Sequence, residues 1–127
     1  MTVRYLNLAE RLRLLWPAGN KTPNCPWRDS AKDIAKLLEK VLSDNNLTDV
    51  SDEDILRVAR VYVNDEKFSE DRKYMRALRY YICKQKIINH KTVCDSLLVP
   101  ALEALRESEA AYESVDNVQA DYGEMLG

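Results

Sequence analysis

Apolar residues recur at helical spacing in several successive segments of the chain. In the segment 30–44 they occupy positions i, i+3, i+4, i+7 and i+8, which form one face of an α-helix. The segments 51–63, 6–16 and 93–112 carry similar stripes. This pattern predicts an all-α protein: a compact bundle of four to five short helices, followed by a flexible acidic C-terminal tail.

The boundaries of the second and third helices are marked by polar residues. Ser30 and Ser51 stand directly before their apolar stripes, where a serine oxygen accepts hydrogen bonds from the first free backbone N–H groups. We expect one helical domain over residues 1–112 and a tail over residues 113–127. The predicted core consists of Leu12, Leu15, Ile34, Leu38, Val41, Leu42, Ile55, Val58, Ala59, Tyr62, Met75, Leu78 and Ile82.

The segment 72–91 contains seven Lys or Arg and no Asp or Glu. We expect a fourth helix over residues 71–86, in which Arg72, Arg76 and Arg79 fall at i, i+4 and i+7 and share one face. Such a row is suited to phosphates or to an acidic protein surface. The candidate binding residues are Arg72, Lys73, Arg76, Arg79, Tyr80 and Lys84.

Two other interpretations of this basic segment remain open. It is also typical of a solvated helix face whose charges pair with carboxylates of neighbouring elements. A helix-turn-helix arrangement, with residues 71–86 as the recognition helix, is the more specific alternative.

The net charge of −2 conceals an uneven distribution, because residues 92–127 hold eight acids and only one base, Arg106. The end of the tail nevertheless carries apolar side chains among its acids. We consider it either a frayed terminus or a short motif that folds on binding a partner. The candidate partner-binding residues of the tail are Asp121, Tyr122, Glu124, Met125 and Leu126.

The residue types needed for catalysis or metal binding do not form a recognisable motif. Cys25, Cys83 and Cys94 lack the spacing of a zinc site, and we expect them to be reduced thiols. His90 is the only histidine, and the chain has no glycine-rich phosphate loop. We therefore expect that the protein is not an enzyme. We expect no catalytic residue, no bound metal and no cofactor.

A tryptophan in a loop, a proline in the last apolar segment and the lack of a long apolar run bear on the fold and on the cellular location. The loop 17–29 holds Trp27, which we expect to plug the core from outside. Pro100 either separates two short helices or kinks one, and we favour the break. The chain contains no apolar run of about 18 residues, so we expect no membrane contact and a cytoplasmic location.

Over about residues 12–86 the chain resembles a group of small, uncharacterised proteins of tailed bacteriophages. The resemblance is carried by LWP at 15–17, WRDS at 27–30, SDEDIL at 51–56, YVN at 62–64 and RKYMRALRYYICK at 72–84. The tail is faintly similar to the peptides by which phage late-transcription and replication proteins bind a sliding clamp, although Gly123 and Met125 depart from that pattern. The resemblance implies the cytoplasm of an infected bacterial host.

These observations predict a non-enzymatic phage accessory protein of DNA metabolism, acting in replication, transcription or packaging. Its expected partners are proteins of the phage or host transcription or replication machinery, with nucleic acid as a further partner. The alternative is a phage protein that binds and inhibits or redirects a host complex without contacting DNA.

Overall fold

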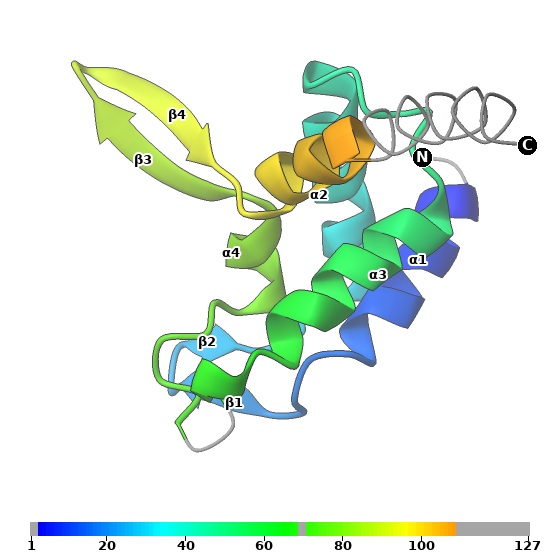
Figure 1. Ribbon diagram of the computed structural model, residues 1–127. Helices are drawn as coiled ribbons and strands as arrows, with labels where there is room; N and C mark the ends of the chain where they lie inside the picture. Colours follow the sequence, from blue (N-terminus) through cyan, green and yellow to red (C-terminus); the bar gives the residue numbers. More distant parts are fainter. Residues whose placement is uncertain (1–2, 69–70, 109–127) are drawn as a thin grey trace, which may run out of the picture.

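The computed structural model describes residues 3–68 and 71–108 of the chain. Within these residues, helices and two small antiparallel sheets are combined, as Figure 1 shows. The helices are α1 (Val3–Arg13), α2 (Ala31–Asp44), α3 (Asp52–Val63), the 3-10 turn η1 (Glu66–Phe68), α4 (Leu78–Ile82) and a last helical segment over residues 98–108. The strands are β1 (Asn20–Thr22), β2 (Cys25–Pro26), β3 (Lys84–Ile88) and β4 (Lys91–Asp95). The predicted all-α class is therefore wrong, since the fold is mixed α and β.

Helices α2 and α3 form where their apolar periodicity predicts them, whereas α1 begins at Val3 and ends at Arg13, earlier in the chain than the predicted segment 6–16. The hydroxyl of Ser30 accepts a hydrogen bond from the N–H of Asp33 at 3.2 Å, and Ser51 caps α3 through the N–H of Asp54 at the same distance. Both serines have extended backbones, which turn the chain into the helix. Helix α1 packs against both α2 and α3.

The core lies between these helices, α4 and the last helical segment. Most of the predicted core is confirmed: its members are buried, except that Leu15, Val58 and Tyr62 are half-buried at its edge. Trp27 is only 8% exposed, so the prediction that it plugs the core is confirmed. Tyr5 of α1 is also buried, and further large side chains close the core from outside the first three helices: Trp16, Leu47, Phe68, Tyr81, Leu98 and Leu102.

The predicted long basic helix over residues 71–86 does not form. Only Leu78–Ile82 is helical, because the backbone before it hydrogen-bonds to distant parts of the chain. The carbonyl of Met75 accepts from the Lys21 ammonium at 2.7 Å, and that of Arg76 accepts from the Trp16 indole at 2.8 Å. In a helix these two backbone carbonyls would accept hydrogen bonds from N–H groups one turn later in the same helix. The recognition-helix interpretation is therefore also wrong.

The N–H groups of the same stretch are held in a similar way. The N–H of Arg76 donates to the hydroxyl of Tyr62 at 2.7 Å. The N–H of Leu78 donates to the carbonyl of Trp27 at 2.9 Å. The chain therefore reaches α4 through a turn at residues 73–74 and an irregular stretch. Helix α4 starts where the N–H of Leu78 is held by the carbonyl of Trp27, just after β2.

After α4 the chain forms a β-hairpin. Strands β3 and β4 pair antiparallel from Lys84 opposite Asp95 to Ile88 opposite Lys91, with Asn89 and His90 as the turn. Both turn residues have positive φ, 53° and 65°, as a two-residue type I′ turn requires. Asparagine adopts this conformation readily, and isoleucines 87 and 88 favour the extended backbone of the strand.

Only part of the helical segment expected over residues 93–112 is helical in the described chain. Val93 lies in β4 and not in a helix, and the last helical segment starts at residue 98, with Pro100 in its first turn. The first turn tolerates proline because its N–H would have no helical partner. Residues 109–127, which include the candidate tail residues 121–126, lie outside the described residues. None of the described helices combines the length and the hydrophobicity that a membrane-spanning segment needs.

Candidate nucleic-acid interface

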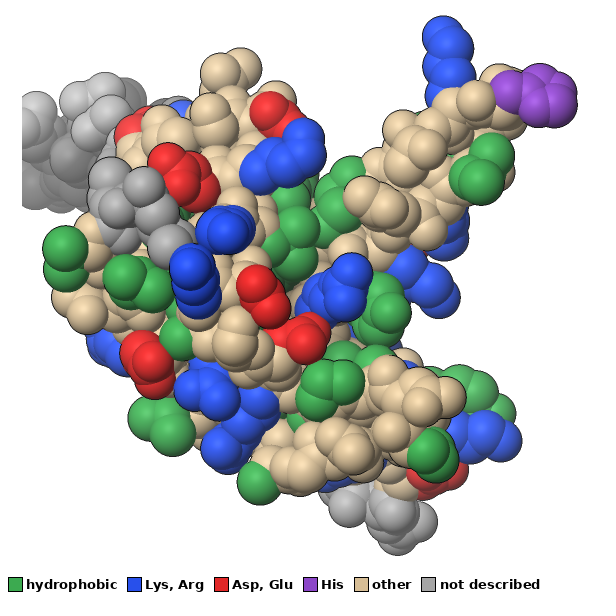
Figure 2. Space-filling model, turned by 180° about the vertical axis from the view of Figure 1, so that it is seen from behind, with side chains coloured by type: hydrophobic (Ala, Val, Ile, Leu, Met, Phe, Trp, Pro, Cys, Tyr) green, Lys and Arg blue, Asp and Glu red, His purple; other side chains and the backbone are tan. Residues whose placement is uncertain are grey.

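The hairpin of β3 and β4, residues 84–95, projects from the helical body and is called the arm below (Figure 1). Every residue of the arm is exposed except Asp95, which is half-buried at its base. Figure 2 shows the arm extending away from the body, with the purple histidine at its end. The arm is therefore accessible from several sides along most of its length.

The two faces of the arm differ in chemistry, because side chains alternate along a strand. On the first face, three basic side chains accompany two aliphatic ones and a single carboxylate; its members are Lys84, Lys86, Ile88, Lys91, Val93 and Asp95. The second face carries Gln85, Ile87, Thr92 and Cys94. Gln85, Thr92 and Cys94 line a hollow of about 470 Å³ shared with Leu37 and Val41 of α2. We call the first face the lysine face.

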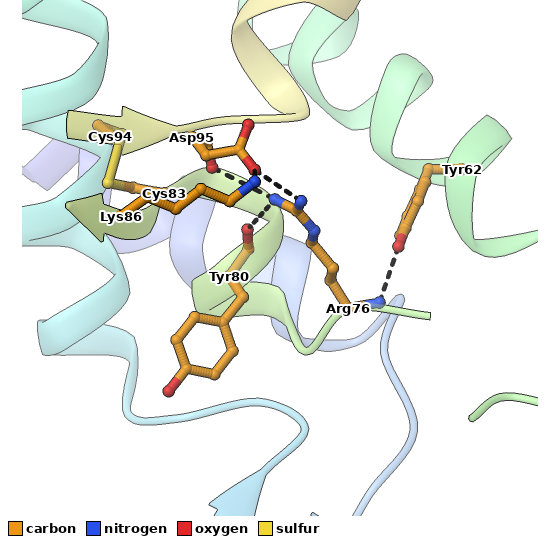
Figure 3. A network of polar contacts seen from close by, with 7 residues as sticks. All are labelled: Tyr62, Arg76, Tyr80, Cys83, Lys86, Cys94 and Asp95. Atoms are coloured by element: carbon orange, nitrogen blue, oxygen red, sulfur yellow. Dashed lines mark hydrogen bonds and ion pairs between the residues drawn. A yellow bond between two sulfur atoms is a disulfide. The ribbon is translucent and has the colours of Figure 1, made fainter. Parts of the chain in front are cut away.

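The base of the arm is held by an ion-pair network around Asp95 (Figure 3). The Oδ2 atom of Asp95 lies 2.8 Å from Nη2 of Arg76 and 3.0 Å from Nζ of Lys86. Nη1 of Arg76 also donates to the carbonyls of Tyr80 and Asp95, at 3.3 Å each. The hydrogen bonds from Arg76 and then Lys86 hold the pKa of Asp95 below its ordinary value. Arg76 thus links the segment before α4 to the end of β4.

A disulfide between Cys83 and Cys94 holds the arm at the same end, with the two Cα atoms 5.4 Å apart (Figure 3). This distance is within the range that disulfides adopt. The expectation of three reduced thiols is wrong for these two residues, and Cys25 is free. The sequence did not indicate the pairing, because the two cysteines become neighbours only when the hairpin forms between them.

The structure separates the predicted basic row. Arg72 is exposed, and its guanidinium lies 3.7 Å from the sulfur of Met75. Arg76 turns to Asp95, so the interpretation of basic groups paired with neighbouring carboxylates is correct for that residue. Arg79 is exposed on α4, with its guanidinium 5.7 Å from the centre of the Tyr80 ring. The three arginines therefore do not share a helix face.

The other two predicted basic residues are exposed in different elements. Lys73 lies in the turn before α4, with its ammonium 5.5 Å from the centre of the Tyr74 ring. Lys84 opens β3 on the lysine face. Among the described residues, neither Lys84 nor Lys91 has an ion-pair partner, so both ammonium groups face solvent.

Sequence reasoning missed the contribution of the arm tip. Eight large hydrophobic side chains are exposed among the described residues, and five of them lie between residues 74 and 93: Tyr74, Tyr80, Ile87, Ile88 and Val93. The exposed apolar groups are thus concentrated in the basic segment 72–91 and directly after it. A usable signal was present in the sequence, since an Asn-led two-residue turn between runs rich in β-branched residues is typical of a hairpin.

The described residues contain no group of three or more His, Cys, Asp or Glu side chains that is placed to hold a metal ion. The chemistry available at the arm is binding by charge and apolar contact.

No protein family, curated protein or solved structure was found to match this chain.

Proposed function

We propose that this protein is a non-enzymatic accessory protein of DNA metabolism and that the arm is its nucleic-acid contact. The observation that carries the proposal is the concentration of unpaired lysines and exposed apolar side chains on one projecting hairpin. The resemblance to tailed-phage proteins supports a phage context, in the cytoplasm of an infected bacterium, and the proposed roles within that context are replication, transcription or packaging.

The charge arrangement of the arm supports this proposal. Lys84, Lys86 and Lys91 lie on one face, and alternate residues of a strand are about 7 Å apart, so positive charge extends along the arm. The one carboxylate, Asp95, lies at the base and is already paired. Phosphate contacts by such lysines release condensed counterions, so binding should weaken steeply as salt is raised.

The test is a salt titration of DNA binding, measured by fluorescence anisotropy with labelled single strands and duplexes. The variant Lys84→Gln/Lys91→Gln removes two unpaired charges from the lysine face. We expect weaker binding and a flatter log–log salt slope. The slope should change by up to about two units, or about one for each phosphate that the variant no longer binds.

A matched control is Lys32→Gln/Lys36→Gln, which removes the same number of lysine charges from exposed positions on α2. The control should retain the slope of the wild-type protein. Equal losses in both variants would show a general effect of net charge, and absence of binding by the wild-type protein at low salt would refute the proposal.

The second candidate function is binding and redirection of a host protein complex without DNA contact. It is supported by the exposure of Ile87 and Val93, at 79% and 42%, because exposed aliphatic side chains also suit a protein interface. Capture from host lysate separates the two functions: a partner lost with Val93→Ser, in a protein that binds no DNA, favours this second candidate.

A further inference from the structure

The tip of the arm carries two isoleucines that are exposed to solvent. Ile87 is 79% exposed and Ile88 53% exposed, and they point to opposite faces of the hairpin. They stand next to a turn of only two residues, and Lys86 and Lys91 lie beside them. Two branched aliphatic side chains at the end of a projecting element gain no burial within the described chain.

The arm is held at its base more firmly than a free hairpin would be. An isolated two-stranded hairpin is marginally stable in water at best. Here the Cys83–Cys94 disulfide and the Arg76–Asp95 ion pair join the base of the arm to the segment around α4. The base of the arm is thus held by the segment around α4, and the tip projects from this base (Figure 1).

We propose that the arm enters a groove of duplex DNA and that Ile87 and Ile88 wedge into a base step at its tip. This inference rests on the proposed function and names its ligand: a duplex that is kinked or partly unstacked. Proteins that bend DNA from the minor groove insert apolar side chains, isoleucine among them, between base steps. Two-stranded β-ribbons can enter this groove, and a kink toward the major groove opens it at the inserted step.

The distribution of charge favours DNA over a protein as the occupant. The lysines extend from the base of the lysine face to the tip, at Lys84, Lys86 and Lys91, whereas the carboxylate is confined to the base. Lys91, which has no ion-pair partner among the described residues, lies beside the wedge and would contact a phosphate next to the opened step. A purely apolar protein pocket would have to bury these same ammonium groups at a cost.

The test compares a perfect duplex of about 25 base pairs with the same duplex carrying a two-base mismatch at its centre. Insertion must unstack a step, and the mismatch has already lost much of that stacking. We expect the full-length protein to bind the mismatched duplex at least about fivefold more tightly. Fluorophores on the two ends should report a bend through increased energy transfer in both complexes.

The variant Ile87→Thr/Ile88→Thr keeps β-branched residues in the strand while shortening and polarising the wedge. It should lose the preference for the mismatch and the bend, while its salt slope stays unchanged because the lysines remain. The matched control is Val61→Thr on α3, where the valine is 70% exposed, and this variant should behave as the wild-type protein.

Each alternative outcome has a definite meaning. Salt-dependent binding without mismatch preference or bending overturns the wedge and leaves the proposed function intact. A preference that survives in the isoleucine variant also overturns it. Absence of binding to any DNA refutes the proposed function and the wedge with it. Loss of a protein partner by the variant, with DNA binding unchanged, assigns the isoleucines to a protein interface and overturns the wedge.

Discussion

At the scale of the residue, two neighbouring tyrosines in the core differ in how their hydroxyl groups are satisfied. The rings of Tyr62 and Tyr81 lie 4.7 Å apart, between Trp16 and Phe68. The hydroxyl of Tyr62 accepts a hydrogen bond from the N–H of Arg76 at 2.7 Å. The hydroxyl of Tyr81 is buried and has no partner among the described residues. Burial raises the pKa of both phenols, so both stay neutral at physiological pH.

This difference predicts opposite effects of two identical substitutions. Tyr81→Phe removes an unsatisfied polar group, so the free energy of unfolding should stay the same or rise slightly. Tyr62→Phe leaves the N–H of Arg76 without its partner and should lower the free energy of unfolding by about 1–3 kcal/mol. Denaturant unfolding of the two variants measures both values, and a larger loss for Tyr81→Phe would contradict the assignment.

At the scale of the element, the arm depends on contacts made at its base. Asp95 ends β4 and meets both Arg76, which precedes α4, and Lys86 of β3. One carboxylate therefore joins three stretches of the chain that are separate in sequence. The negative charge of Asp95 holds these stretches together, so protonation of this carboxylate in acid should weaken the base of the arm.

The direction of that response follows from the lowered pKa of Asp95, caused first by the hydrogen bond from Arg76. A free aspartate titrates near pH 3.9. The stabilisation by the network is thus fully present above about pH 4 and is lost as the pH falls through the lower folded pKa. We expect the carboxyl carbon of Asp95 to titrate below pH 3.9 in NMR spectra, with exchange protection of the arm amides decreasing over the same range.

The variant Asp95→Asn serves as the control for this titration. Its arm should be less protected from hydrogen exchange at neutral pH, because Arg76 has lost its anion. It should also lose less protection than the wild-type protein on acidification. A wild-type Asp95 that titrates at or above the ordinary value would show that the network does not form.

At the scale of the whole molecule, stability comes from the apolar cluster that joins α1, α2, α3, α4 and the last helical segment. Leu38 of α2 is completely buried, whereas Leu14, just after α1, is 74% exposed. Truncating the two leucines removes the same atoms from opposite environments. The comparison therefore isolates the contribution of burial.

Leu38→Ala should lower the free energy of unfolding by about 2–5 kcal/mol, because it removes apolar contacts and leaves a cavity. Leu14→Ala should change it by less than about 0.5 kcal/mol, as is usual for exposed sites. Thermal or denaturant unfolding followed by far-UV circular dichroism measures both. Similar losses in the two variants would contradict the position of the core.

Much of the fold was predictable from the sequence because it depends on local periodicity. The helix faces of α2 and α3, the serine caps at residues 30 and 51 and most core positions follow from residues within a few turns of one another. Even the basic character of the candidate site was evident, since composition alone places seven positive charges in the segment 72–91.

The tertiary structure alone decided the conformation of that segment and the residues that meet there. Its apolar and basic spacing suited a helix, but Trp16, Lys21, Trp27 and Tyr62 take hydrogen bonds that such a helix would have made internally. These partners are remote in sequence, so no local pattern contains them. Once the helix is restricted to α4, the following residues pair as a hairpin, and Cys83 and Cys94 come together across it. Long-range hydrogen bonds outweighed local helix preference because the buried backbone groups of the segment must be paired wherever it runs.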